Sequence, residues 1–184
     1  MDRDLVERAM AGDHDAFSEL ASVSIGRLFV IARLILRDEE RAEDATQEAL
    51  IRAWRDLSAL RDPDRFEPWL RRLLVRACYR EASAGRRRTA IEAQVRPLDG
   101  VMPDPGLGLA DRDQLERGFR RLDAEQRAIL VFHHYLGLSL SEISETLGIP
   151  LGTVKSRFHR ATQIMRAALD ADARTPAFAE GPTS

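Results

Sequence analysis

The stretch SLSEISETLGIPLGTVKSRFHRAT, residues 139–162, decides the fold of the C-terminal part of this chain. Leu140, Ile143 and Leu147 recur at spacings of three and four residues, which predicts an amphipathic helix. Gly148 supplies the left-handed residue that ends this helix, and a second helix begins near Pro150. The stretch therefore predicts a helix-turn-helix.

The second helix of this pair has a polar and basic face. Val154, Phe158 and Ala161 repeat at i, i+4 and i+7 and face the core. Recognition helices present such a face to the major groove, with the N-terminal residues at base edges and basic side chains at phosphates or guanine. Residues 155–166 contain four basic residues and no acidic one, which disfavours a purely structural helix pair. The candidate DNA-binding residues are Thr153, Lys155, Ser156, Arg157 and Arg160.

The same periodicity extends over almost the whole chain, and no run of residues alternates with period two. We therefore expect an all-α protein with two small helical domains, residues 1–88 and 112–170. Prolines and glycines between Thr89 and Ala110 predict a flexible linker over residues 89–111. We expect a disordered tail over residues 171–184. The expected helices cover about 3–11, 14–36, 39–57, 64–84, 112–120, 123–136, 140–147 and 151–169.

Charge is segregated along the chain, although the net charge of its 184 residues is only −2. Residues 37–48 carry six acidic and two basic residues, for a local net charge of −4. Residues 71–88 carry seven arginines and one glutamate, for a local net charge of +6. Two separate basic segments, 71–88 and 155–166, indicate two contacts with a polyanion, whereas the acidic segment indicates a protein partner.

The expected helix over residues 64–84 places arginines next to an aromatic side chain. Leu70, Leu74 and Cys78 share its apolar face, so we interpret Cys78 as a core residue and not as a reactive thiol. Arginine beside an aromatic ring suits single-stranded nucleic acid, because bases stack on both groups while the backbone is neutralised. The candidate nucleic-acid-binding residues here are Arg72, Arg76, Tyr79, Arg80, Arg86, Arg87 and Arg88.

The expected helix over residues 39–57 has an apolar side and an acidic side. The apolar side holds small residues and leucines and is predicted to be core. The opposite side places one aliphatic residue among polar ones, which is typical of a protein-binding surface: Asp44, Gln47, Glu48 and Ile51. A second interpretation is that acidic residues near a helix start only interact favourably with the helix dipole.

Several other classes of protein are disfavoured by the sequence. A single cysteine excludes an internal disulfide and a cysteine-rich metal site, and the adjacent His133 and His134 point about 100° apart on a helix. We therefore expect no metal and no cofactor. No site combines carboxylate, histidine and cysteine side chains for catalysis, so an enzyme is not expected. Apolar runs are far shorter than the ~18 residues of a membrane span, and the N-terminus lacks a secretory signal, so we expect a cytoplasmic protein without membrane insertion.

Three segments together resemble the bacterial extracytoplasmic-function (ECF) group of RNA polymerase sigma factors. RAEDATQEALIRAWRDL, residues 41–57, is similar to the helix of that family that binds core RNA polymerase. FEPWLRRLLVRACYREASAGRRR, residues 66–88, is similar to its helix for the promoter minus-ten element. LDAEQRAILVFHHYLGLSLSEISETLGIPLGTVKSRFHRA, residues 122–161, is similar to its minus-thirty-five domain.

This resemblance implies a function and a set of partners. The protein would bind core RNA polymerase through Asp44, Gln47 and Glu48 and would direct transcription initiation at promoter DNA. The basic residues of the two DNA segments would contact the minus-ten and minus-thirty-five elements, and an anti-sigma factor would hold the protein inactive, as in relatives.

The middle segment departs from the family pattern, and alternatives remain open. Many members carry Asn at the position of Ala77 and Asp at the position of Glu81. One alternative is therefore a sigma-like protein that sequesters polymerase or an anti-sigma factor. Another is a stand-alone helix-turn-helix regulator of transcription, although that function would leave residues 39–88 unexplained.

Overall fold

The structure, a computed structural model, describes the backbone of residues 2–91 and 109–173 and the side chains of residues 2–85 and 115–170. These backbone ranges contain helices and turns and no strand, which confirms the all-α fold class. Residues 92–108 of the expected linker and residues 174–184 of the expected tail lie outside the described residues.

The N-terminal half is a bundle of four α-helices. Asp13 begins α2 by accepting hydrogen bonds from the backbone N–H groups of Asp15 and Ala16, as expected for an N-cap. Asp38 caps α3 in the same way through the Arg41 N–H. The helices are α1 (Arg3–Met10), α2 (His14–Leu36), α3 (Glu39–Asp56) and α4 (Phe66–Ile91), with 3₁₀ turns at Leu57–Ala59 and Pro63–Arg65.

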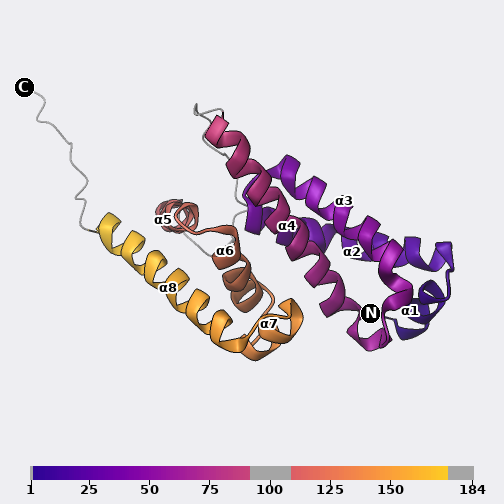
Figure 1. The fold of residues 1–184 in the computed structure, drawn as a ribbon. Coiled ribbons are helices and arrows are strands. Elements are labelled where there is room, and N and C mark those ends of the chain that lie inside the picture. Colours follow the sequence, from indigo (N-terminus) through magenta and orange to yellow (C-terminus); the bar gives the residue numbers. More distant parts are fainter. Residues whose placement is uncertain (1, 92–108, 174–184) are drawn as a thin grey trace, which may run out of the picture.

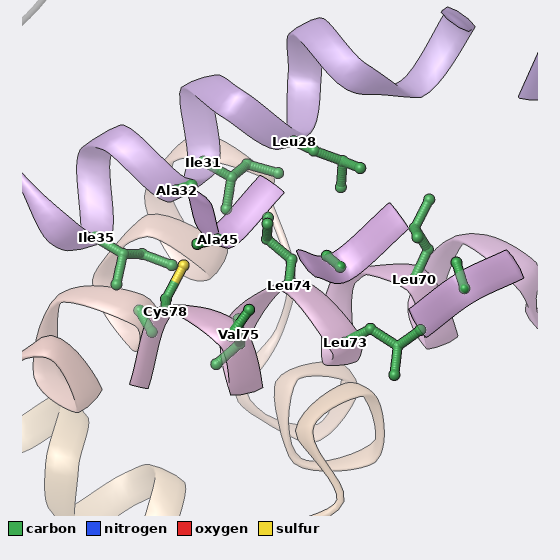
Figure 2. Close-up of a cluster of buried hydrophobic side chains, with 14 of the residues drawn as sticks. Leu28, Ile31, Ala32, Ile35, Ala45, Leu70, Leu73, Leu74, Val75 and Cys78 are labelled. Atoms are coloured by element: carbon green, nitrogen blue, oxygen red, sulfur yellow. The ribbon is translucent and has the colours of Figure 1, made fainter. Parts of the chain in front are cut away.

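The core of this half lies where α4 packs against α2 and α3. Leu74 and Cys78 of α4 are fully buried, as are Ile31 and Ile35 of α2. Figure 2 shows Leu74 and Cys78 directed toward α2. The small residues Ala42, Ala45, Ala49 and Ala53 of α3 are also fully buried, so α3 approaches its neighbours closely along its apolar side.

The C-terminal half contains the expected helix-turn-helix. Gly148 ends α7 with φ +67°, a left-handed conformation that residues with a Cβ adopt only with strain. Ser139 and Glu142 form a reciprocal capping box at the start of α7, with each side chain bonded to the other residue's backbone N–H. The elements are α5 (Leu109–Arg120), α6 (Ala124–Leu130), a π-helical turn (Val131–Tyr135), α7 (Leu140–Leu147) and α8 (Leu151–Ala173).

Several element boundaries differ from those expected. The helix expected to end near residue 84 continues to Ile91, and the one expected from residue 112 begins at Leu109, so both ends of the expected linker are helical. The segment 123–136 is not one α-helix, because a π-helical turn follows Leu130. α8 continues to Ala173. Boundaries of this kind depend on what the last turn packs against and not only on local sequence.

The two halves share one hydrophobic core. Helix α6 packs against α2 and α4, and α7 packs against α4. Phe132, Ile143 and Val154 of the C-terminal half are fully buried in the same cluster as the core of the N-terminal half. Figure 1 shows α6 and α7 beside α4, with α3 on the other side of α4. None of the helices among the described residues is long and apolar enough to span a membrane.

Candidate nucleic-acid and protein interfaces

The recognition helix α8 presents part of the expected basic face. Val154 is fully buried and Phe158 is half-buried against the core, which fixes the rotation of the helix. Lys155, Ser156 and Arg160 are exposed, as the spacing predicted. Ser156 donates a hydrogen bond from Oγ to the backbone oxygen of Thr153 at 3.0 Å.

Two of the five candidate residues on α8 are less accessible than expected. Thr153 is half-buried, and the side chain of Arg157 is only 27% exposed. Arg157 forms an ion pair with Glu125 of α6, with 2.5 Å between Arg157 Nη2 and Glu125 Oε2. Both side chains are thus only partly open to solvent, and Glu125 of α6 holds Arg157 on this side of α8.

The arginine stripe of α4 is divided between solvent and the C-terminal half. Arg76 is exposed. Arg72 instead donates hydrogen bonds to the backbone oxygens of Thr146 (from Nε) and Glu145 (from Nη2), both at 2.6 Å. Burial lowers the pKa of its guanidinium, and nearby Arg76 adds to the effect. Arg72, a candidate nucleic-acid-binding residue, is therefore bonded to the C-terminal half in this structure.

Tyr79 is also covered. Burial raises the pKa of its phenol, and the nearby carboxylate of Glu125 raises it further. The Tyr79 hydroxyl is buried and has no hydrogen-bond partner among the described residues. The Tyr79 side chain is thus half-buried against the shared core, within the electrostatic reach of Glu125 and Arg157 of the C-terminal half.

Arg80 links the basic stripe of α4 to the acidic side of α3. Its Nη2 lies 2.9 Å from Oε1 of Glu48, and Arg52 holds the same carboxylate at 3.0 Å. Partial burial alone would raise the pKa of Glu48, but the hydrogen bonds and charges of Arg80 and Arg52 outweigh it and lower the pKa. Glu48 is therefore held as a carboxylate in a fixed position.

The remaining residues of the acidic side of α3 are open to solvent. Asp44 and Gln47 are exposed, and Ile51 is 51% exposed. An aliphatic side chain exposed between polar neighbours is typical of the centre of a protein-binding surface. The structure thus confirms the exposure predicted for Asp44, Gln47 and Ile51.

Gly85 lies in the C-terminal part of α4, close to the side chain of Arg41. A Cβ at this position would overlap the guanidinium of Arg41, so Gly85 leaves the space in which Arg41 crosses α4. Ala77 is fully buried and belongs to the core. Arg86, Arg87 and Arg88 lie within α4, and their side chains are outside the described ones.

Three residues with important contacts were not singled out by the sequence. Arg37, at the C-terminal end of α2, contacts Glu116, whereas Arg127 of α6 donates to the backbone oxygen of Ile35. Glu125 holds Arg157. Their partners lie tens of residues away or depend on how helices pack, so periodicity along one helix cannot identify them.

The other candidate sites behave as packing residues. Cys78 is fully buried, which confirms its place in the core, and this burial raises the pKa of its thiol to about 12. His133 Nδ1 lies 2.8 Å from the backbone oxygen of Leu138. The described residues contain no cluster of three or more His, Cys, Asp or Glu side chains suited to a metal.

The fold and these surfaces define an all-helical protein that combines a helix-turn-helix with a second basic helix and a separate acidic face. Two family models match the chain: sigma-70 region 2 over residues 24–88 and sigma-70 region 4 over residues 112–165. The chain is 35% identical to the ECF RNA polymerase sigma factor SigM of Mycobacterium tuberculosis, over 87% of this chain and 80% of SigM. It is 29% identical to SigW of Bacillus subtilis, over 88% of this chain and 92% of SigW.

Solved structures show the same fold. CnrH, in complex with the cytosolic domain of CnrY, matches with a TM-score of 0.62 and 28% identity over 93% of this chain and 98% of CnrH. RpoE of Bartonella quintana, in complex with the anti-sigma factor NepR, matches with a TM-score of 0.66 and 22% identity over 85% of this chain and 98% of RpoE. The chain belongs to the ECF group of RNA polymerase sigma factors and directs promoter-specific transcription.

Proposed function

We propose that three surfaces of this chain divide the work of transcription initiation. The acidic side of α3, with Asp44, Gln47, Glu48 and Ile51, docks on core RNA polymerase. The N-terminal domain, residues 1–88, holds the minus-ten element through α4. The C-terminal domain, residues 112–170, binds the minus-thirty-five element through α8.

The observation that carries this assignment is the exposed face of α3. Ile51 is among the few large apolar side chains in the described part of the chain that are more than half exposed, and Asp44 and Gln47 surround it. Exposing such a residue gives no folding stability, whereas burying it against a partner contributes binding energy. Helix α3 lies on the side of α4 away from α6 and α7 (Figure 1), and Asp44, Gln47 and Ile51 are exposed.

The proposed DNA contacts divide between unpaired bases and duplex. Single-stranded bases suit the arginines and the tyrosine of α4, which are Arg72, Arg76, Tyr79, Arg80, Arg86, Arg87 and Arg88. The major groove suits the polar and basic residues of α8, which are Thr153, Lys155, Ser156, Arg157 and Arg160. Each of the two DNA contacts is weak by itself. Once polymerase fixes the separation of the two domains, binding of one promoter element raises the effective concentration of the other. The chain supplies no catalytic residue in this proposal and acts in the cytoplasm, where polymerase and promoters are.

We also infer an anti-sigma partner. CnrH and RpoE, which share this fold, were solved in complex with CnrY and the anti-sigma factor NepR. A protein that covers the acidic side of α3 would prevent the proposed contact with polymerase, and one that also covers α4 and α8 would prevent both proposed contacts with DNA. Co-purification of the chain with the product of a neighbouring gene would identify such a partner.

The test is run-off transcription with purified core RNA polymerase on fragments of the source genome. We expect discrete new transcripts in the presence of the chain. Ile51→Ala should weaken binding to core polymerase by about tenfold. Val23→Ala is the matched control, because Val23 is an exposed aliphatic residue of α2, 67% exposed, outside the proposed face.

A second arm tests the promoter contact of α8. Arg160→Ala should reduce transcript yield from promoters with an intact minus-thirty-five element by roughly tenfold. Arg166→Ala, an exposed arginine further along the same helix, should change the yield little. Tight binding to core polymerase without any transcript would instead favour the sequestering alternative.

A further inference from the structure

We propose that the free chain is held closed by an arginine latch, in which Arg72 of α4 caps the C-terminal end of α7, and that this latch withholds part of both DNA-binding surfaces while α3 stays open to polymerase. The proposal rests on the surface assignments made above. It deepens them by giving the Arg72 guanidinium two mutually exclusive partners, which are the backbone oxygens of α7 and a DNA phosphate.

The first observation is the position of the Arg72 guanidinium. Its two hydrogen bonds reach the backbone oxygens of Glu145 and Thr146, at the end of the first helix of the helix-turn-helix. Carbonyls in the last turn of a helix have no partner within the helix and carry the negative end of its dipole. A cation that donates two hydrogen bonds there is bound by both effects.

Two further arginines reinforce the same closure. Arg37 donates to the backbone oxygen of Glu116 at 3.2 Å and to its Oε1 at 2.5 Å, and the Arg37 side chain is only 6% exposed. Arg127 donates from the C-terminal half to the backbone oxygen of Ile35 at 2.5 Å. Three arginines thus bond across the boundary between the halves, and each reaches a main-chain oxygen.

The closed arrangement removes specific side chains from DNA. Arg72 and Tyr79 of the proposed minus-ten surface lie against the C-terminal half, and Arg157 of the proposed minus-thirty-five surface is paired with Glu125. The acidic side of α3 is not covered, because Asp44, Gln47 and Ile51 remain exposed. Polymerase can therefore dock before the DNA contacts become available.

The closed state also carries a built-in cost. The buried Tyr79 hydroxyl has no hydrogen-bond partner among the described residues, and leaving such a group unpaired is unfavourable. Separation of the halves relieves this cost, and a phosphate can replace the carbonyl partners of Arg72. Binding of nucleic acid at α4 and release of the helix-turn-helix are therefore coupled, and the coupling is reciprocal.

Distances between nitroxide labels on the full chain test this proposal by double electron–electron resonance. Ser58→Cys and Gln163→Cys place labels on exposed positions of the two halves. Cys78 is buried and stays unlabelled. We expect a narrow distance distribution for the otherwise unchanged chain, and a ratio of closed to open molecules about tenfold lower for Arg72→Ala.

The matched control is Arg76→Ala, which removes an exposed arginine one turn further along the same helix and should leave the distribution unchanged. Arg72→Lys is a second opening variant, which keeps the charge but cannot bond both backbone oxygens in the same geometry, and it keeps the test decisive if Arg72→Ala fails to fold. A single-stranded DNA of about ten nucleotides should shift the unchanged chain toward the open state.

A broad distribution of label distances in the otherwise unchanged chain would overturn the latch. The same would follow if Arg72→Ala and Arg76→Ala gave the same distribution of label distances. The measurement uses the free protein, so it does not depend on polymerase. A closed chain that yields no transcripts would contradict the proposed function and not the latch, whereas an open chain that initiates transcription would contradict the latch alone.

Discussion

Arginine side chains decide the contacts between distant parts of this molecule. Of the 28 basic residues, only Lys155 is a lysine. The planar guanidinium donates several hydrogen bonds in a fixed fork, which lets Arg72 bond two consecutive backbone oxygens at 2.6 Å. A lysine would supply the charge without that geometry, so Arg72→Lys would not be a conservative substitution.

A prediction at the scale of one residue concerns Cys78. A rise in pKa from 9.0 to about 12 lowers the thiolate fraction at pH 8 by on the order of 10³. We expect a thiol reagent to modify the native chain at least that much more slowly than the chain unfolded in urea. A Ser58→Cys variant is the internal control, since its exposed thiol should react at once. Rapid native modification of Cys78 would show that α4 is not packed as described.

At the scale of elements, helix ends position the helix-turn-helix. Ser139 starts α7 and Gly148 ends it, so the first helix has fixed limits on both sides. The capping box also favours the ionised carboxylate of Glu142, because hydrogen bonds with Ser139 lower its pKa. These local interactions fix the direction in which α8 leaves the turn.

The capping box gives a prediction with a pH dependence. Ser139→Ala should reduce the free energy of unfolding by about 1 kcal/mol at pH 7. The pKa of Glu142 is lower in the folded than in the unfolded chain, so its contribution is present above the unfolded pKa near 4.5 and is lost as pH falls through the folded value.

Urea denaturation of both proteins at pH 7 and pH 3 checks this prediction, and the difference should shrink at pH 3. Ser141→Ala, an exposed position in the same helix, is the control and should change stability little. An equal effect of both substitutions would show that the capping box does not stabilise α7.

At the scale of the whole molecule, the shared core makes the two halves depend on each other. Phe132 is fully buried in the cluster that includes α2 and α4, although it belongs to the C-terminal half. Both tryptophans of the chain, Trp54 and Trp69, lie in the N-terminal half. Tryptophan fluorescence therefore reports on one half, whereas circular dichroism reports on all helices.

We expect Phe132→Ala to lower the free energy of unfolding by about 3–5 kcal/mol and to shift the tryptophan transition with it. The fluorescence and circular dichroism transitions of the unchanged chain should coincide. Tyr135→Ala, at a 51% exposed aromatic of the same turn, is the control. If Phe132→Ala left the midpoint of the tryptophan fluorescence transition unchanged, the two halves would unfold independently.

Local patterns predicted most of the elements and the faces that depend on one helix alone. The exposure of Ile51, the burial of Cys78 and the left-handed turn at Gly148 each follow from spacing within about two turns. The partial burial of Arg72, Tyr79 and Arg157 was not anticipated, for a common reason. Each was assigned to the polar face of its own helix from spacing alone, and each is approached by an element from another part of the chain.

The sequence by itself determined the all-helical class, the helix-turn-helix, the charge segregation and the family resemblance, because these depend on periodicity, caps and residue order along the chain. How the two halves meet, which arginines bond across them and which candidate DNA-binding residues are partly buried became known only from the tertiary structure. Such contacts join residues more than 70 positions apart, such as Arg72 with Thr146, and they follow from helix packing and hydrogen-bond satisfaction, which no local pattern encodes.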